Sequence, residues 1–321
     1  MKKKINLAIV GLGHWGRNYL RIFEGIKNVN IKKICDLNNS KFKNRNDFTS
    51  NFNEILNDKN INAIVISTIA KTHYILAKKA LEKGKHVLIE KPITLNLNHA
   101  KILKKLSDKN KCTLMVGHTF LYNQSVIKLK QILKKKIAGE IYYINCRRTH
   151  LGLIRDDVDA IWDLAPHDIS ILNYIINKKP KNGKLKKVKC LNKKRADAAF
   201  IHLEYPANII ANIHVSWVDS NKSRLVEIIG SKARILFDDL NQLEPIKIFL
   251  KGVSVEKNNN NDAFFYNLRD GDILSPKVNL KEPLYEMCVD FINSILNKRN
   301  PTSGFKVGYE CIKILKSLKE M

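Results

Sequence analysis

The sequence has no cysteine pattern that would cross-link a fold or bind zinc. Its six cysteines form no C-x-x-C pair and lie far apart, at Cys35, Cys112, Cys146, Cys190, Cys288 and Cys311. This spacing indicates neither a disulfide framework nor a metal site, and it favours a reduced, cytoplasmic environment. Apolar runs are short as well, far below the roughly 20 residues that cross a bilayer, so we expect no membrane association.

Acidic residues are scarce relative to basic ones. The chain has 30 Asp and Glu against 57 Lys and Arg, a formal net charge of +27. Such a charge can attract nucleic acid, anionic membranes or acidic small molecules. The basic residues are mostly dispersed lysines, without the clustered arginine and aromatic side chains of phosphate and base recognition. We therefore expect no nucleic-acid partner, and we interpret the densest lysine stretch, residues 178–194, as a solvated loop and strand edge rather than a polyanion site.

The chain is long enough for two domains. It has 321 residues, of which 44% are hydrophobic, as in ordinary globular proteins. Up to about residue 120, apolar runs of strand length alternate with helical patterns. Strands are predicted over residues 5–10, 30–35, 63–68, 86–89 and 112–117, and helices over 53–57, 72–83 and 95–110. This alternation predicts an α/β, doubly wound Rossmann domain over residues 1–120.

Beyond residue 120 the pattern becomes β-rich. Strands are predicted over residues 139–149, 198–204, 209–218, 225–229 and 233–238, helices over 161–176, 284–296 and 308–318, and a loop over 258–261. Several of these strands alternate apolar and polar residues, as strands with one solvated face do. Residues 121–321 are therefore predicted to form an α+β domain with a large open, mostly antiparallel sheet, which binds substrate and mediates assembly into a homodimer or homotetramer.

A glycine turn organises the first predicted domain, because an apolar strand runs directly into G-x-G-x-x-G. Gly11 permits the tight turn, Gly13 lets a pyrophosphate approach the backbone, and Gly16 lets the next helix pack closely. His14 and Trp15 begin that helix, whose free N–H groups and positive dipole end suit phosphates. Three glycines in six residues also occur in ordinary loops, so the dinucleotide interpretation depends on the elements that follow.

Asp36 supports the dinucleotide interpretation of the glycine turn. It ends the second predicted strand, 20 residues after Gly16. An acid at this place can accept both ribose hydroxyls of NAD and repels the 2′-phosphate of NADP. The sequence therefore predicts a dinucleotide site that uses NAD, with NADP disfavoured.

Two groups of residues are candidates for chemistry. Lys91 stands between Glu90 and Pro92 at the carboxyl end of a strand, the edge at which doubly wound sheets bind ligands; the alternative is an ordinary surface lysine. Asp163 and His167 are four residues apart and share a face if the segment is helical, so the carboxylate can orient the imidazole. The alternative there is helix capping and a structural histidine.

Together these motifs resemble those of the Gfo/Idh/MocA oxidoreductases, the glucose-fructose oxidoreductase and inositol dehydrogenase family, over nearly the whole chain. The matching features are the turn at residues 11–16, the E-K-P at 90–92, the D-x-x-x-H at 163–167, the tail at 300–304, and residues 68–73, which resemble a T-P-x-x-x-x-H segment with Ala70 in place of proline. E-K-P and D-x-x-x-H at this separation are the specific part of the resemblance.

The resemblance implies hydride transfer between nicotinamide and a ring carbon that bears a hydroxyl. It implies His167 as the base, Lys91 as a hydrogen-bond donor to the reacting oxygen, and Asp163 as the group that holds the imidazole or a neighbouring hydroxyl. The implied cofactor contacts are Gly11, Gly13, His14, Trp15, Gly16, Asp36, Thr68, His73, Glu90 and Lys91. The implied substrate contacts are Lys91, Tyr122, Arg155, Asp163 and His167.

Within the family, residues 117–123 and 159–167 look most like members that act on nucleotide-linked sugars, among them a group that oxidises the 3-hydroxyl of UDP-linked N-acetylated sugars. Leu121 and Gln124 depart from the arginine and proline that the family often has there, which bears on sugar selectivity. A keto-sugar reductase and an inositol or polyol dehydrogenase are the enzyme alternatives. An NAD-binding regulator on the same scaffold is the non-enzyme alternative.

Overall fold

The computed structural model describes residues 4–38, 42, 45–191, 193–257 and 264–321. The chain divides into two compact units, one of residues 1–122 with 282–313 and the other of residues 123–281 with 314–321. Residues 282–313 thus belong to the first unit, which differs from the single boundary near residue 120 that the sequence predicted. The reason is packing: this stretch contacts the first helix and residues 119–122, and Ser303 O accepts a hydrogen bond of 2.8 Å from Val116 N.

The first unit is built on a six-stranded sheet in which every pair of neighbours is parallel. Its spatial order is β3 (Phe48–Thr49), β2 (Val29–Cys35), β1 (Ile5–Val10), β4 (Ala63–Ile66), β5 (His86–Ile89) and β6 (Leu114–Val116). Every residue of β4 is buried, as expected for a central strand covered on both faces. The predicted doubly wound Rossmann domain is confirmed, with its switch point between β1 and β4.

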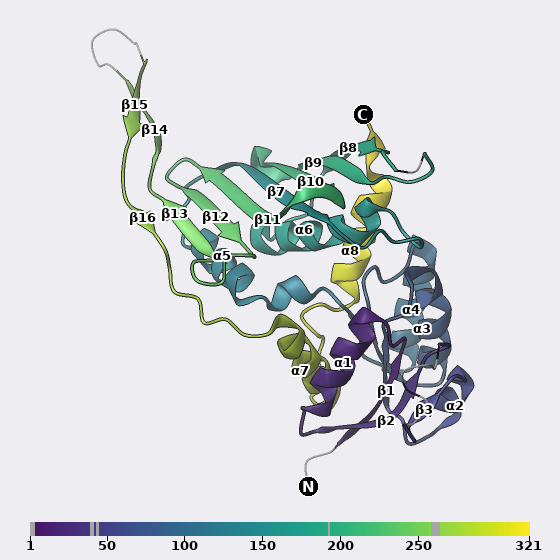
Figure 1. The fold of residues 1–321 in the computed structure, drawn as a ribbon. Helices are drawn as coiled ribbons and strands as arrows, with labels where there is room; N and C mark the ends of the chain where they lie inside the picture. Colours follow the sequence, from purple (N-terminus) through teal and green to yellow (C-terminus); the bar gives the residue numbers. More distant parts are fainter. Residues whose placement is uncertain (1–3, 39–41, 43–44, 192, 258–263) are drawn as a thin grey trace. The chain divides into compact units, whose positions relative to one another are not determined.

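Helices cover both faces of this sheet (Figure 1). They are α1 (His14–Glu24), α2 (Phe52–Asn57), α3 (His73–Glu82), α4 (Leu97–Lys109), α7 (Pro283–Leu296) and the first part of α8 (Phe305–Ser317). Their ends follow from local chemistry: the Asn96 side chain accepts from two backbone N–H groups at the start of α4, and Gly84, with a φ of +69°, follows α3. Helix α1 packs against α7, and α3 packs against α4.

The second unit contains a nine-stranded sheet. Its spatial order is β16 (Ile273–Leu274), β13 (Ile246–Phe249), β12 (Arg234–Asp238), β11 (Val218–Gly230), β7 (Ile141–Leu151), β10 (Ile210–Ser216), β9 (Ala198–Glu204), β8 (Asn182–Val188) and β17 (Lys319–Glu320). Only the β7–β10 and β8–β17 pairs are parallel among its neighbours. The predicted large, mostly antiparallel sheet is therefore confirmed. Strand β8 occupies part of the lysine-rich stretch.

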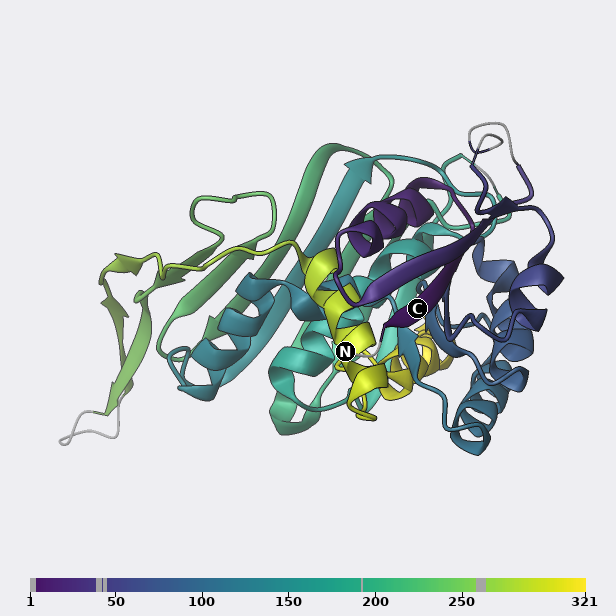
Figure 2. The same cartoon turned by 90° about the horizontal axis from the view of Figure 1, so that it is seen from below.

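Helices α5 (Gln124–Lys134) and α6 (Ala160–Ile176) cover one face of the nine-stranded sheet, as both views show (Figures 1 and 2). The strands alternate accordingly: Ile144, Cys146 and Arg148 of β7 are buried beneath the helices, whereas the residues between them are more accessible. On the other face, Phe200 is 47% exposed and stacks on His214. The sheet is open on that side of the unit.

The sequence patterns did not indicate several elements of the second unit. Among them are α5, the short strands β13, β16 and β17, and the hairpin of β14 (Gly252–Lys257) and β15 (Phe264–Arg269), whose strands pair with each other. The loop predicted over residues 258–261 lies outside the described residues. Of the helices in the described ranges, none combines the length and apolar character needed to cross a membrane.

Candidate active site

The glycine turn has the geometry that a dinucleotide requires. Gly11 has a φ of +89°, and a Cβ there would lie 2.8 Å from Ser67 and Thr68 atoms. A Cβ on Gly16 would lie 1.8 Å from the carbonyl oxygen of Gly11, so α1 can approach the turn only with glycine at this position. A Cβ on Gly13 would meet nothing within 4 Å, which leaves open space above the backbone. The turn therefore fits a pyrophosphate at the start of α1.

Neighbouring strand ends hold this turn in place. Asp36 follows β2, and its carboxylate accepts hydrogen bonds from the backbone N–H of Leu12 and, at 2.8 Å, from that of Asn38. Ser67 follows β4, and its hydroxyl donates to Gly11 O at 2.8 Å. Asp36 is half-buried beside the turn. This is the position from which an acid can meet the ribose of NAD.

Replacing Asp36 should change cofactor preference. Asp36→Arg should narrow or invert the preference for NAD over NADP by about tenfold or more, the effect of one charge interaction of about 1.4 kcal/mol. Asp36→Asn keeps an acceptor for Leu12 N–H but removes the charge, so it separates turn geometry from repulsion of the 2′-phosphate. Affinities for both cofactors from fluorescence titration measure the effect, and equal affinity of the wild-type protein for both would refute the assignment.

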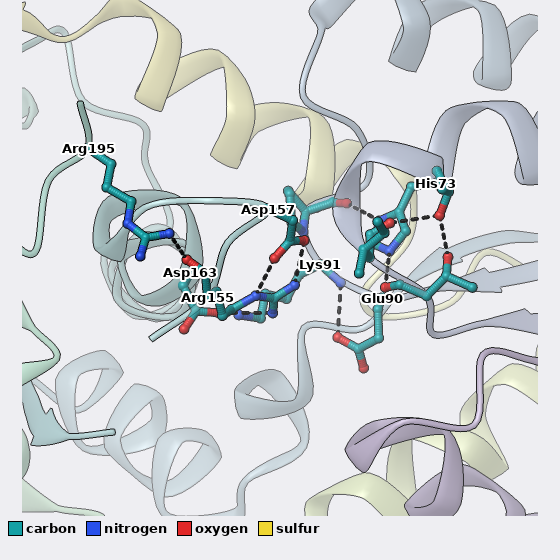
Figure 3. A network of polar contacts seen from close by, with 11 residues as sticks. His73, Glu90, Lys91, Arg155, Asp157, Asp163 and Arg195 are labelled. Carbon is teal, nitrogen blue, oxygen red and sulfur yellow. Dashed lines mark hydrogen bonds and ion pairs between the residues drawn. The ribbon is translucent and has the colours of Figure 1, made fainter. Parts of the chain in front are cut away.

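His73 connects two loops at the carboxyl edge of the parallel sheet (Figure 3). Its Nδ1 lies 2.7 Å from Pro92 O, and its Nε2 lies 3.1 Å from Thr68 O. Thr68 belongs to the segment after β4, and Pro92 belongs to the turn after β5. The buried imidazole therefore connects two loops at the carboxyl edge of the parallel sheet. A direct contact of His73 or Thr68 with the cofactor remains a prediction.

Lys91 and Glu90 leave β5 at the same edge, and both are buried. The Glu90 carboxylate accepts a hydrogen bond of 2.6 Å from the Tyr19 hydroxyl and another of 3.1 Å from the backbone N–H of Lys91. Burial and the nearby Glu90 charge raise the pKa of Tyr19 well above its usual value. Glu90 thus links α1 to the turn that carries Lys91. Hydrogen bonds made by Lys91 N and by Pro92 O hold the backbone on both sides of the Lys91 side chain.

His118, which follows β6 at this edge, was not among the predicted site residues. Its side chain is 1% exposed, and burial, followed by the charge of Lys91, lowers its pKa to about 3. The rule that drew attention to Lys91, a chemically capable residue just after a parallel strand, applies equally to His118. It was noticed only as one residue of a segment that resembles other family members.

In the second unit, α6 carries Asp163 and His167. Both are partly exposed, while the intervening Leu164, Ala165 and Pro166 are buried, so the two residues share the accessible stripe of the helix. The helix begins there because the Asp159 side chain accepts a 3.0 Å hydrogen bond from Trp162 N. The expected helix and the shared face are confirmed, and the catalytic roles remain predictions.

Arg155 lies in the loop before α6 and contacts two carboxylates (Figure 3). It makes a bidentate pair with Asp157, at 2.8 and 2.9 Å, and a 3.3 Å contact with Asp163. Burial works against its charge, but hydrogen bonds and charges of these two acids outweigh burial, and the pKa of Arg155 is raised. Asp163 is thus held by a cation.

Tyr122 has a clear structural contact in the first unit. Its buried hydroxyl donates to Asp290 Oδ2 at 2.7 Å and lies 3.1 Å from Ser303 Oγ. This bond attaches the segment after β6 to α7. The predicted substrate contact of Tyr122 stays a prediction. Among the residues that the structure describes, no three His, Cys, Asp or Glu side chains gather as a metal site requires.

A parallel sheet in 3-2-1-4-5-6 order with this glycine turn defines the class of dinucleotide-binding α/β proteins. Two family models match the chain: residues 5–118 match "Oxidoreductase family, NAD-binding Rossmann fold", and residues 126–236 match "GFO/IDH/MocA C-terminal domain". The chain belongs to the Gfo/Idh/MocA oxidoreductase family, and its first unit is an NAD-binding Rossmann domain.

Curated relatives agree with this assignment. An uncharacterized oxidoreductase, YdgJ of Escherichia coli, is 30% identical over an alignment 183 residues long that covers 52% of this chain and 52% of the relative. Inositol 2-dehydrogenase of Salmonella typhimurium is 22% identical over an alignment 196 residues long that covers 56% of this chain and 57% of the relative. In these two matches the chain spans about half the length of the relative.

Solved structures share the fold over almost the whole chain. UDP-N-acetylglucosamine 3-dehydrogenase from Acidithiobacillus ferrooxidans has a TM-score of 0.77 and 22% identity, covering 98% of this chain and 96% of that one. Aldose-aldose oxidoreductase from Caulobacter crescentus has a TM-score of 0.81 and 15% identity over the same shares. At these identities the likeness shows the fold of both units.

Proposed function

We propose that this protein is an NAD-dependent dehydrogenase that transfers hydride between nicotinamide and a secondary hydroxyl or keto carbon of a sugar. The observation that carries the proposal is Lys91, a buried lysine directly after β5 in the unit that holds the glycine turn. Lysine is rarely buried to this degree, and the carboxyl edge of a doubly wound sheet is where ligands bind. An ammonium group at that edge can stabilise an oxygen that gains negative charge.

NAD, when bound, accepts or returns the hydride. His167 takes the proton of the substrate hydroxyl, because imidazole is the side chain best suited to exchange protons near neutral pH. Lys91 donates a hydrogen bond to the same oxygen, and Asp163 holds the imidazole or a neighbouring hydroxyl. Arg155 and Tyr122 complete the proposed substrate contacts. If the reaction runs in the reverse direction, the same groups act in a keto-sugar reductase.

A nucleotide-linked sugar, of the UDP-N-acetyl class, is the substrate that we favour. The net charge of +27 raises the local concentration of a dianionic diphosphate. The shared fold with UDP-N-acetylglucosamine 3-dehydrogenase agrees with this class. A polyol is the second candidate, because inositol 2-dehydrogenase is among the curated relatives.

A substrate screen tests this proposal. The protein is incubated with NAD⁺ and, in separate reactions, UDP-N-acetylglucosamine, UDP-glucose, myo-inositol and free glucose, and NADH absorbance is followed. We expect NAD⁺ to be reduced with a UDP-sugar at a rate at least about tenfold above the rate with myo-inositol or free glucose, since the diphosphate adds charge–charge binding energy. Preference for myo-inositol would move the assignment to the polyol class. Tight NAD binding without turnover in either direction would instead favour the NAD-binding regulator.

A further inference from the structure

His118 is a buried imidazole that the fold leaves without hydrogen bonds. Its side chain is 1% exposed, and within the described part of the chain neither Nδ1 nor Nε2 has a hydrogen-bond partner. More than nine in ten buried polar groups in proteins are hydrogen-bonded, because an unsatisfied one is unfavourable. An apolar side chain would serve stability better here. The position therefore calls for an explanation other than stability.

The strand register makes His118 a neighbour of Lys91. Strands β5 and β6 are parallel with Ile89 opposite Val116, and Gly117 N donates to Ile89 O at 2.8 Å. A Cβ on Gly117 would lie 2.9 Å from Glu90 Oε1, so the next two residues, Glu90 and Gly117, are in contact. One residue further along each chain segment come Lys91 and His118, each two residues beyond the end of its strand, and the Lys91 charge acts on the imidazole.

The chemical state of His118 follows from this environment. Burial and the positive charge of Lys91 lower the pKa of His118 to about 3, so the ring is neutral at physiological pH. A neutral imidazole has one N–H donor and one nitrogen acceptor. Such a ring is a poor general base at neutral pH, because its protonated form is disfavoured. It can still accept a hydrogen bond from an ammonium group.

We propose that His118 is a positioning residue for Lys91, whose ammonium donates a hydrogen bond to the neutral ring during turnover. The inference rests on the proposed function, in which Lys91 donates a second hydrogen bond to the substrate oxygen. A lysine side chain is long and loses much rotamer freedom when it is fixed, so an acceptor beside it sets its orientation. A neutral acceptor leaves the positive charge available for the alkoxide, whereas a carboxylate there would cancel it.

Three variants test the role in the full-length enzyme. His118→Phe keeps a flat ring without nitrogens, and His118→Asn and His118→Gln retain an acceptor near the Nδ1 and Nε2 positions. With NAD⁺ and UDP-N-acetylglucosamine, or the best substrate of the screen above, His118→Phe should lower kcat about 10- to 100-fold, the effect of one hydrogen bond to a charged group. The KM for NAD⁺ should hardly change, and Tm should stay or rise. Asn or Gln should restore part of kcat.

A second measurement needs no substrate and observes the wild-type ring, so it tests the role even if a His118 variant folds poorly. In ¹⁵N spectra of histidine-labelled wild-type protein, the His118 ring should remain neutral between about pH 5 and 8. The Lys91→Met substitution should shift the signal of the unprotonated ring nitrogen of His118. Wild-type kcat in His118→Phe, or ring signals indifferent to Lys91→Met, would overturn the positioning role. Full turnover in Lys91→Met would refute the proposed function of Lys91. Full turnover in His118→Phe together with an inactive Lys91→Met would refute only the positioning role of His118.

Discussion

Lys91→Ala and His167→Ala should each lower kcat at least about 100-fold, as the loss of general acid–base help usually does. In the proposed reaction one residue stabilises the substrate oxygen and the other removes its proton, so neither can replace the other. NAD affinity should remain near that of the wild-type protein, because the glycine turn and Asp36 are untouched. Lys101→Ala, which removes an exposed lysine of α4, is the control and should keep wild-type turnover.

The double variant gives the sharper result. Because both groups act on one proton and one oxygen in the proposed reaction, Lys91→Ala with His167→Ala should be little worse than the worse single variant. Asp163→Asn should reduce turnover less than either, and it should shift the pH profile of kcat/KM if the carboxylate tunes the imidazole. Near wild-type turnover in His167→Ala would remove His167 as the base and make Lys91 the leading candidate.

The largest effect on stability is expected at a buried ion pair in the second unit. Arg148 of β7 makes a bidentate pair with Asp168 of α6, at 2.8 and 2.9 Å, and their side chains are 6% and 1% exposed. Burial works against the charge of Arg148, but Asp168 outweighs it and raises its pKa. Removing one partner by Asp168→Asn or Arg148→Met leaves an uncompensated buried group and should cost about 3–5 kcal/mol of unfolding free energy.

Urea unfolding followed by tryptophan fluorescence measures this loss, since Trp162 and Trp217, two of the three tryptophans, lie in the second unit. Arg148→Met combined with Asp168→Leu should cost less than either single change, because no unpaired charge remains. The solvent-accessible pair of Lys247 and Glu244, at 2.9 Å and also in the second unit, is the matched control, and Lys247→Met should change stability little. Equal small losses at both pairs would show that the Arg148 pair is not a stabilising contact.

The parallel half of the fold was predictable because its signals are local. Strands such as Ala63–Ile66 are buried on both faces and appear in the sequence as unbroken apolar runs. Gly84 marks the end of α3 through its positive φ. The strands of the second unit that the patterns did not indicate lack such marks: β13 has four residues and β16 has two, and in the described residues β14 and β15 pair with each other. A run of two to four residues is too short for a period to show.

By itself, the sequence determined which residue types follow each parallel strand, and hence the glycine turn, Asp36 and Lys91 as candidates. A period of two or 3.6 residues also determines which face of an element is apolar. It does not determine the partner of that face, so only the tertiary structure assigned α7 to the first unit and paired Arg148 with Asp168. Only the tertiary structure distinguished His118 from the other histidines, because burial and the lack of a ring hydrogen bond within the described residues depend on parts of the chain distant in sequence.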